Sequence, residues 1–330
     1  MKKIFKENFK FIILLILLLL IFNIEFPYYI DAPGGISNIE EKIEIDGYKS
    51  KGSFNLAYVK EYKATIPTLL ISLFNKDYNI YKQEEVLLEE ETDDTYFLRD
   101  RILMEESISN AIGVAYKYAN KKIEVISNKL LITYITPEAQ TNLEIDDEII
   151  EINAKKIYTK SEITNIVNDL NYEDKLKIKV KNNNKTYDRY AYVINDSDSK
   201  KIGILISNIK EYETYPKVKV NVDKNESGSS GGLITALSIY NSLVKKDITN
   251  GLKIVGTGTI DENGNIGSIG GVKYKLKSAV KEKADLFIVP NDENYEEAIK
   301  LKKENNYNIE IIGVSTFEET INYLKNIKIK

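Results

Sequence analysis

The stretch whose residue types could support chemistry most directly is Glu226–Leu237, which reads ESGSSGGLITAL. Its serines and glycines open onto an apolar pattern at helical spacing, and the β-branched alternation of Val218, Val220 and Val222 precedes them. The predicted order is therefore strand, tight loop and buried helix. Hydroxyls and free amides at a helix N-terminus favour negative charge, so the loop suits an oxyanion. A flexible loop with a serine N-cap is the plainer interpretation of the same residues.

The composition limits which base a nucleophile in this loop can use. The 330 residues contain no His and no Cys. This excludes a Ser-His-Asp triad, a Cys-His dyad and a His-ligated zinc site. A serine nucleophile then needs a lysine, or less readily a carboxylate, as its general base. A lysine with an ordinary pKa of about 10.4 is almost fully protonated near neutral pH, so desolvation must lower that pKa by a few units.

A candidate lysine lies in a second glycine-rich stretch, residues 256–276, which reads GTGTIDENGNIGSIGGVKYKL. Asn263-Gly264 predicts a hairpin turn, and Val272 begins a predicted helix. Two lysines on that helix, Lys273 and Lys275, project about 200° apart, so only one of them can face the serine loop. The helix also carries Lys277.

At these two stretches the sequence resembles the Lon-type serine proteases. GSSGG at 228–232 is similar to their GPSAG nucleophile motif, and IGGVKYK at 269–275 is similar to their IGGxxxK lysine motif. The resemblance implies that Ser230 is the nucleophile and Lys275 the general base. It also implies that Thr257 orients the lysine by a hydrogen bond.

Two alternatives to this assignment remain. Ser229 or Ser227 is the nucleophile if the motif is shifted in register, and Lys273 is the base if the helix presents its other face. The motif departs from its commonest form where Ser229 stands for proline and Gly231 for alanine, and both changes loosen the loop. The expected oxyanion donors are the backbone amides of Gly228, Ser229 and Ser230.

The N-terminal residues predict a membrane anchor. Lysines dominate residues 1–10, and a continuously apolar run follows from Phe11 to Phe22. With its extension to Ile30, this run approaches the roughly 20 residues that a bilayer requires. We therefore expect residues 1–10 in the cytoplasm, a single-pass transmembrane anchor at 11–30 in the cell membrane, and the rest outside the cytoplasm. A cleavable signal peptide competes with this interpretation, although no small-residue cleavage site follows.

Residues 31–122 are expected to form an extracytoplasmic N-terminal region that can contribute strands to the protease domain. Alternation predicts a strand at 52–59, and apolar spacing predicts a helix from Met104 to Ala119. The acidic run from Gln83 to Asp94 is most simply a solvated helix or loop face.

Residues 123–195 resemble a PDZ domain. LEIDDEIIEIN at 143–153 is similar to the LxxGDxIxxIN of bacterial PDZ domains, a strand is predicted at 130–135, and a helix at 161–170 precedes a strand at 175–180. The resemblance implies that a peptide pairs as an added strand along a groove edge. The residues expected at this edge are Leu130, Leu131, Ile132 and Thr133.

Residues 200–330 alternate strands with helices, as in an α/β domain with crossovers, and form the expected Lon-like protease domain. Strands are predicted at 202–206, 218–222, 254–260, 286–289 and 309–314, and helices at 230–245, 272–283, 293–304 and 316–325. The predicted fold is thus an α/β (α+β) Lon-type protease domain plus a PDZ domain, with one N-terminal transmembrane helix. No GxxxxGK[ST] phosphate loop occurs in the sequence. From end to end, the chain resembles the YlbL-type membrane-anchored, PDZ-containing Lon-like serine proteases.

This resemblance implies an ATP-independent membrane-anchored serine endopeptidase with a Ser-Lys dyad. Its substrates would be extracytoplasmic peptides or flexible protein segments, which the PDZ domain recruits or whose access it gates. Membrane lipid is a second expected partner, and a homo-oligomer is a third because the family's protease domains often form rings. We expect no cofactor and no metal, and the net charge of −4 does not indicate nucleic acid. The alternative is a membrane-anchored PDZ binding or scaffold protein with an inactive protease domain.

Overall fold

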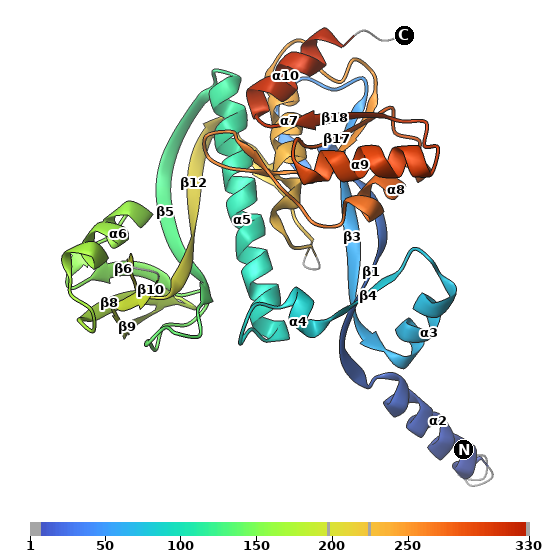
Figure 1. Cartoon of the computed structure of the whole chain (residues 1–330). Helices are drawn as coiled ribbons and strands as arrows, with labels where there is room; N and C mark the ends of the chain where they lie inside the picture. The colour runs from blue at the N-terminus through green and yellow to red at the C-terminus, as the bar shows by residue number, and fades with distance from the viewer. Residues whose placement is uncertain (1–7, 197–198, 224–225, 328–330) are drawn as a thin grey trace.

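A six-stranded sheet lies at the centre of the computed structural model, which describes residues 8–196, 199–223 and 226–327. Its strand order is β18-β17-β14-β3-β1-β4 (Figure 1). β3 is parallel to β14, β14 to β17 and β17 to β18, whereas β1 is antiparallel to both β3 and β4. The strands are β1 (Glu25–Asn38), β3 (Ser53–Thr65), β4 (Asn79–Lys82), β14 (Lys253–Gly256), β17 (Leu286–Pro290) and β18 (Glu310–Val314).

Helices from the C-terminal part of the chain cover both faces of this sheet. Adjacent strand residues point to opposite faces, and Ile254 and Val255 of β14 accordingly belong to two different core clusters. The Ile254 cluster contains residues of α7 and α10, and the Val255 cluster contains residues of α8 and α9. These helices are α7 (Gly232–Leu243), α8 (Val272–Lys281), α9 (Glu293–Glu304) and α10 (Phe317–Asn326). The expected α/β class is confirmed.

The N-terminal region supplies interior strands of this sheet. β3 lies between β14 and β1, and its residues Phe54 and Ala57 are fully buried. Residues that are far apart in the sequence therefore build one core. The strand predicted at 52–59 is present and continues to Thr65.

A second sheet has the strand order β12-β5-β6-β8-β9, and β7 (Lys155–Lys156) pairs with β6. Helix α6 (Lys160–Asp169) packs on this sheet through Ile163 and Val167. The strand predicted at 130–135, the helix at 161–170 and the strand at 175–180 are confirmed as β5, α6 and β8. The strands are β5 (Lys122–Ile135), β6 (Glu148–Ile152), β8 (Lys175–Asn182), β9 (Lys185–Tyr192) and β12 (Ile204–Tyr215).

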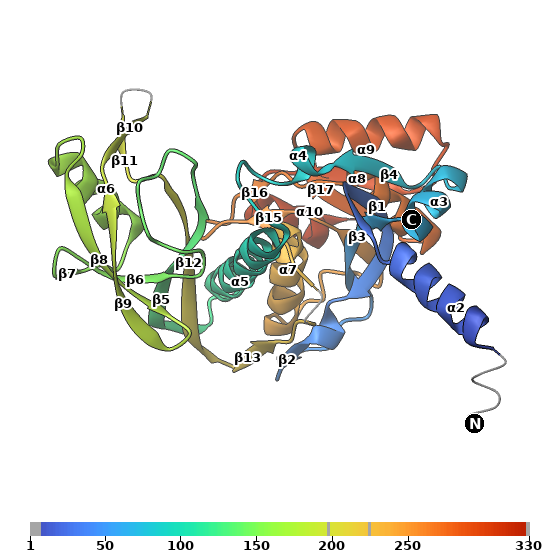
Figure 2. The ribbon, with the colours of Figure 1, turned by 90° about the horizontal axis from the view of Figure 1, so that it is seen from below.

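Helix α5 (Asp93–Tyr118) stands between the two sheets, as Figures 1 and 2 show from two directions. The side chain of Thr92 caps its N-terminus by accepting a hydrogen bond from the Thr95 amide. Ile102 packs against the second sheet, and Ala111 packs in the core beneath α7. The apolar spacing predicted only the second half of this helix. The acidic run of 83–94 forms α4 (Gln83–Val86), a short connection and the start of α5.

The N-terminal helix is shorter than expected. α2 (Phe9–Phe22) ends at Phe22, and Glu25 begins β1, so the single helix predicted over 11–30 is wrong. Tyr29 and Ile30 are instead buried in the central sheet, where they pair with Lys63 and Tyr62 of β3. In the part of the chain that the structure describes, no helix is long and apolar enough to cross a membrane. Most of the predicted cytoplasmic segment, residues 1–7, lies outside the described residues.

Several short elements complete the described chain. β2 pairs with β13, β15 pairs with β16, and β10 pairs with β11. α3 follows β3 and contacts α2. Their bounds are β2 (Ile43–Ile45), β10 (Ile194–Asp196), β11 (Ser199–Lys201), β13 (Val218–Val220), β15 (Thr259–Ile260), β16 (Ile266–Gly267), α3 (Ile66–Phe74) and the 3₁₀ turns η1 (Glu40–Lys42) and η2 (Ser229–Gly231).

Candidate active site

Ser230 lies in η2, immediately before the buried helix α7. Gly228 precedes η2 with a φ of 89°, a left-handed conformation that glycine adopts without a steric cost. Gly232 is constrained by space, because a Cβ there would lie 2.4 Å from the Ser107 hydroxyl oxygen. The glycines that flank the serines are thus needed for a sharp, closely packed turn, and the flexible-loop interpretation is not required.

Two backbone carbonyls of this turn are held by hydrogen bonds. The Ser230 carbonyl accepts from the Gly258 amide at 2.8 Å and from the Thr257 hydroxyl at 3.2 Å. The Ser229 carbonyl accepts from the Ser107 hydroxyl at 2.8 Å. Ser107 lies on α5 and was not predicted as a site residue, because nothing in the local sequence indicates that α5 reaches the serine loop.

Lys275 lies on α8 with its side chain in the protein interior. Only 4% of its surface is exposed, and its Nζ donates a hydrogen bond to the Thr257 hydroxyl at 3.1 Å. Burial lowers the pKa of the Lys275 amine to about 8, because desolvation penalises the charged form. At about pH 7, roughly a tenth of this amine is neutral, far more than for an ordinary lysine.

The neighbouring Lys273 points elsewhere. Its Nζ donates to the Asn79 side chain at 3.2 Å in the edge strand β4, whereas Thr257 follows the interior strand β14. The helical separation of the two lysines therefore places only Lys275 next to Thr257.

Thr257 connects the lysine to the serine loop. Its fully buried hydroxyl accepts from Lys275 and donates to the Ser230 carbonyl, so the three predicted residues lie together. Among the described residues, no direct hydrogen bond joins the Ser230 hydroxyl to the Lys275 amine. Catalytic hydrogen bonds are often long without substrate and shorten in the reacting complex, so this geometry is compatible with proton transfer.

One of the three amides expected to bind the oxyanion, that of Gly228, already donates a hydrogen bond within the protein. The Gly228 amide donates to the Asp100 carbonyl at 3.1 Å, so the prediction that Gly228 supplies an oxyanion amide is wrong for this arrangement. The amides of Ser229 and Ser230 are different, because they open a helical turn and have no acceptor within it. They are the two amides that the turn leaves for an oxyanion.

A cleft of about 880 Å³ opens at the serine loop. Ser230 and Gly231 line it on one side, and residues 56 and 58–62 of β3 line it on the other. β14 pairs with β3 only as far as Leu56, so beyond that residue β14 no longer covers this edge of β3. An extended peptide can pair with such an edge by strand addition.

Carboxyl groups make part of the cleft acidic. Desolvation, with a smaller contribution from the nearby Asp31, raises the pKa of Glu61 to about 7. Desolvation also raises the pKa of Asp31, which is opposite Glu61 in the β1–β3 pairing, to about 6. Glu61 lines the cleft, whereas Asp31 lies on the neighbouring strand.

The predicted peptide-binding edge is not an edge. Residues 130–133, which are Leu130, Leu131, Ile132 and Thr133, lie in β5, which is paired with β12 on one side and with β6 on the other. The prediction is therefore wrong, because the segment has no free backbone edge. β12 is one of the two edge strands of this sheet, and its Ile204 and Ile206 pack on the core together with Ile166 and Leu170 at α6. The sequence predicted a strand at 202–206 but assigned it to the protease domain.

Comparison with known protein families gives two matches. Residues 110–189 match the PDZ domain, and residues 188–326 match the Lon protease (S16) C-terminal proteolytic domain. No curated protein matches the chain.

Solved structures that match include two small domains. One is the PDZ domain of the SdrC-like protein from Listeria monocytogenes, with 18% identity over 25% of this chain and 92% of that chain and a TM-score of 0.23. The other is the second domain of the listeria protein Lin2157, with 20% identity over 25% of this chain and 87% of that chain and a TM-score of 0.22.

The two family matches correspond to the two sheets except at β12, which belongs to the second sheet but lies in the protease match. The first covers most of the second sheet with α6, and the second contains Ser230, Thr257 and Lys275. The central sheet also uses β1 and β3, which precede both matched segments. With these two domains in one chain, the protein is a PDZ-containing Lon-like serine protease.

Proposed function

We propose that the protein is an ATP-independent serine endopeptidase in which Ser230 is the nucleophile and Lys275 the general base. The observation that carries this proposal is the buried Lys275 amine, whose lowered pKa and hydrogen bond to Thr257 place a partly neutral base beside the serine loop. A serine becomes nucleophilic when an adjacent base removes its proton.

The steps follow from these positions. Neutral Lys275 takes the proton of the Ser230 hydroxyl, and the serine oxygen attacks the carbonyl carbon of the scissile peptide. The amides of Ser229 and Ser230 stabilise the negative charge that develops on the carbonyl oxygen. The protonated lysine then gives its proton to the leaving amine. A water molecule, activated by the same lysine, hydrolyses the acyl-enzyme and regenerates both side chains.

The substrates are peptides or flexible protein segments in an extended conformation. The open edge of β3 along the cleft supports this, because a peptide must be unfolded to pair with a strand edge. The sequence contains no phosphate-binding loop for an ATP-driven unfolding motor, so folded substrates are poor candidates.

The PDZ domain selects substrates through the free edge of β12. Ile204 and Ile206 of β12 and Ile166 and Leu170 at α6 are partly buried apolar residues that pack on the same core, and the surface between them is the proposed groove. A peptide that adds to β12 would place alternate side chains against these residues. The edge strand replaces residues 130–133 as the recognition element.

The location we propose is the outer face of the cell membrane, with α2 and α3 in contact with lipid. The apolar side chains of α2 are exposed around the helix, and α3, which contacts α2, exposes 73% of Leu73 and 89% of Phe74. Both helices lie at the same end of the molecule (Figure 1). Lipid would remove this apolar surface from water. The homo-oligomer that the resemblance implies stays a prediction.

Flotation with phosphatidylcholine–phosphatidylglycerol vesicles tests this location. The full chain should float with the vesicles, and replacing Leu73 and Phe74 with Glu should reduce the bound fraction. Tyr172→Glu changes an exposed aromatic residue of the PDZ domain and should leave flotation unchanged. A full chain that stays in the aqueous fraction would contradict membrane contact.

The alternative function is a PDZ binding or scaffold protein whose protease domain is inactive. Cleavage of a quenched-fluorescent library of unstructured peptides discriminates between the two. The wild type should cleave the peptides. Ser230→Ala and Lys275→Ala should each reduce the rate to background, because the two residues act as one catalytic unit and the loss of either one disables it. Lys273→Ala is the matched control and should retain activity. Equal cleavage by Ser230→Ala would remove this serine from the mechanism.

A further inference from the structure

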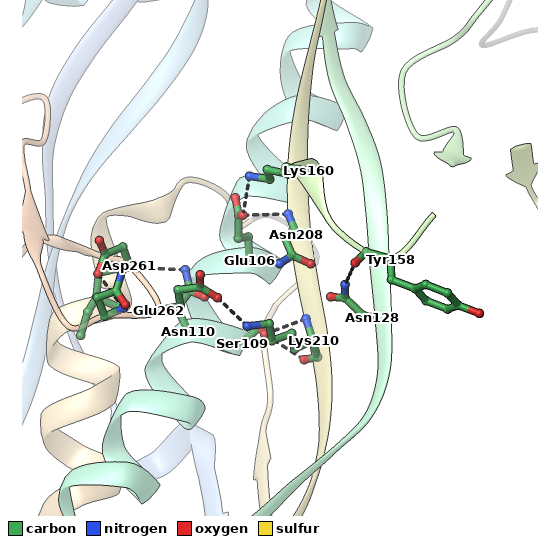
Figure 3. Close-up of polar contacts among 12 residues, drawn as sticks. Glu106, Ser109, Asn110, Asn128, Tyr158, Lys160, Asn208, Lys210, Asp261 and Glu262 are labelled. Carbon is green, nitrogen blue, oxygen red and sulfur yellow. Dashed lines mark hydrogen bonds and ion pairs between the residues drawn. The ribbon is translucent and has the colours of Figure 1, made fainter. Parts of the chain in front are cut away.

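One face of α5 holds the edge strand of the PDZ domain. One carboxylate oxygen of Glu106 accepts a hydrogen bond from the Asn208 amide at 2.8 Å (Figure 3). The other accepts from the Ser207 hydroxyl at 2.8 Å. Glu106 also forms an ion pair with Lys160, the first residue of α6, with 3.4 Å between Lys160 Nζ and Glu106 Oε1. A single side chain of α5 therefore contacts both β12 and α6, the two elements that flank the proposed peptide groove.

Ser109 extends this contact along β12. Its hydroxyl accepts from the Lys210 amide at 3.0 Å and contacts the Lys210 carbonyl at 2.8 Å (Figure 3). Backbone groups two residues apart on a strand point the same way, so the amides of Ile206 and Ile204 face the same side as that of Asn208. A peptide that adds to this edge and extends past Ile206 reaches the Glu106 carboxylate.

Another face of the same helix holds the serine loop. The Ser107 hydroxyl donates to the Ser229 carbonyl at 2.8 Å, and the Asp100 carbonyl accepts from the Gly228 amide at 3.1 Å. Asn110 donates to the Ile260 carbonyl at 3.1 Å. Positions 100, 107 and 110 lie on one side of a helix, whereas 106 and 109 share the adjacent side.

The Ser107 contact fixes the direction of a backbone amide. The Ser229 carbonyl and the Ser230 N–H belong to one planar peptide group and point in opposite directions when the bond is trans. By holding the carbonyl, the buried Ser107 hydroxyl prevents this group from rotating and keeps the Ser230 N–H turned away from α5. That N–H is one of the two amides that remain for the oxyanion.

We propose that Ser107 is a positioning residue for the oxyanion amide of Ser230, and that α5 passes the state of the PDZ edge strand to it. This inference rests on the proposed peptidase function. Glu106 and Ser107 are consecutive on a helix that packs in the core of the protease domain and, through Ile102, in a small cluster with β5 and β12, so a displacement of the helix backbone at Glu106 also displaces Ser107. A peptide that displaces Glu106 from β12 would then change the orientation of the Ser229–Ser230 peptide group.

The first experiment tests the positioning role of Ser107. It measures the rate at which a peptidyl diphenyl phosphonate labels Ser230. Ser107→Ala should lower this rate about tenfold, the upper range for one hydrogen bond, and should lower kcat while leaving KM for a short peptide unchanged. Ser107→Thr retains the hydroxyl and should restore most of the rate. Labelling of Ser107→Ala at the wild-type rate would overturn the positioning role.

The second experiment tests the link through Glu106 with a matched pair. Glu106→Ala removes the contacts to β12 and α6, whereas Glu105→Ala removes the same charge from an exposed neighbour on the helix. Amide hydrogen exchange is followed in the segments around Asn208 and around Ser230, together with phosphonate labelling. Glu106→Ala should accelerate exchange in both segments and slow labelling several-fold, and Glu105→Ala should do neither. Ser109→Ala removes the Lys210 contacts and should act in the same direction as Glu106→Ala.

The outcomes separate this inference from the proposed function. Faster exchange near Asn208 with wild-type exchange and labelling at Ser230 would show that α5 holds the edge strand without transmitting its state. If the wild type is not labelled at Ser230, the proposed function fails. In that case the exchange of the serine loop in Ser107→Ala and Glu106→Ala still decides the inference, because it does not depend on catalysis.

Discussion

At the level of single residues, the proposed mechanism depends on the Lys275 amine. Among the described residues, no carboxylate pairs with the buried Lys275 amine, and desolvation lowers its pKa to about 8. Thr257 is the neutral group that fixes its position. A base of this kind works because burial makes the neutral form accessible near physiological pH.

The pH dependence of cleavage follows from this pKa. Below about pH 8 the Lys275 amine is mostly protonated and cannot accept the Ser230 proton, and above it the amine is neutral. kcat/KM for a short peptide should therefore rise with pH and level off above about pH 8. Glu61→Gln is the control, because burial raises the pKa of Glu61 in the same cleft to about 7. The midpoint of the kcat/KM profile should not move in this variant. A profile that is flat from acid to alkaline pH would contradict a lysine base.

The same pKa has a consequence for stability. The folded protein lowers the pKa of Lys275 from 10.5 to about 8, so the unfolded state binds the extra proton between these values. The folded state therefore carries a penalty of about 3 kcal/mol below about pH 8, which disappears as the pH rises toward 10.5. Lys275→Met should raise the free energy of unfolding near neutral pH, and the gain should shrink in alkaline denaturation curves. A gain that is equal at all pH values would point to packing alone.

The sequence predicted the candidate catalytic residues better than the residues that hold the serine loop in position. The resemblance of the two glycine-rich stretches to Lon-type motifs indicated Ser230, Thr257 and Lys275, and hydrogen bonds connect the Lys275 amine through the Thr257 hydroxyl to the Ser230 carbonyl. Ser107 could not be predicted, because its role depends on where α5 lies in space. The loss of Gly228 as an oxyanion donor likewise depends on the Asp100 carbonyl of that helix.

At the scale of elements, the order of strands and helices was predictable and their pairing was less so. α7, α8, α9 and α10 begin and end within a few residues of their predicted bounds, because their apolar spacing and capping residues are local signals. The edge of the PDZ sheet was misassigned, because β12 lies far along the chain from β5 and pairs with it only in the fold. The N-terminal segment predicted as one helix over 11–30 forms two elements, because the apolar residues up to Phe22 end α2 and the segment from Glu25 to Ile30 begins β1. Hydrophobicity alone did not distinguish the two.

The groove between β12 and α6 gives a prediction for recognition. Ile166→Glu places a charge on the apolar wall of the groove and should reduce cleavage of a protein substrate several-fold. The rate at which a small phosphonate labels Ser230 should not change, because the probe does not need the groove. Asn165→Glu adds the same charge at an exposed position of α6 and is the control. If Ile166→Glu and Asn165→Glu behave alike in a folded domain, the groove is not the recognition site.

At the scale of the whole molecule, the protease core is built from both ends of the chain. β3 lies between β14 and β1, and the PDZ domain follows α5, which packs in the same core. This arrangement was only partly predictable, because the pairing of β3 with β14 joins segments about 200 residues apart and has no local signal. The order of domains along the sequence therefore differs from the boundaries of the folded units.

This architecture predicts the behaviour of a truncated chain. Residues 200–330 alone should not fold, because without β3 the strand β14 becomes an exposed edge and the core loses Phe54. Thermal unfolding followed by circular dichroism should show no cooperative transition for this fragment, whereas residues 24–330 should unfold cooperatively. A cooperative transition in the shorter fragment would show that the N-terminal strands are dispensable.

The most direct test of the central claim is the site at which a fluorophosphonate reacts, determined by mass spectrometry of the digested protein. We predict a single adduct on Ser230, which forms faster as the pH rises through about 8 and is lost in Lys275→Ala. An adduct on Ser227 or Ser229, or labelling of Ser230 at an undiminished rate in Lys275→Ala, would contradict the Ser230–Lys275 dyad.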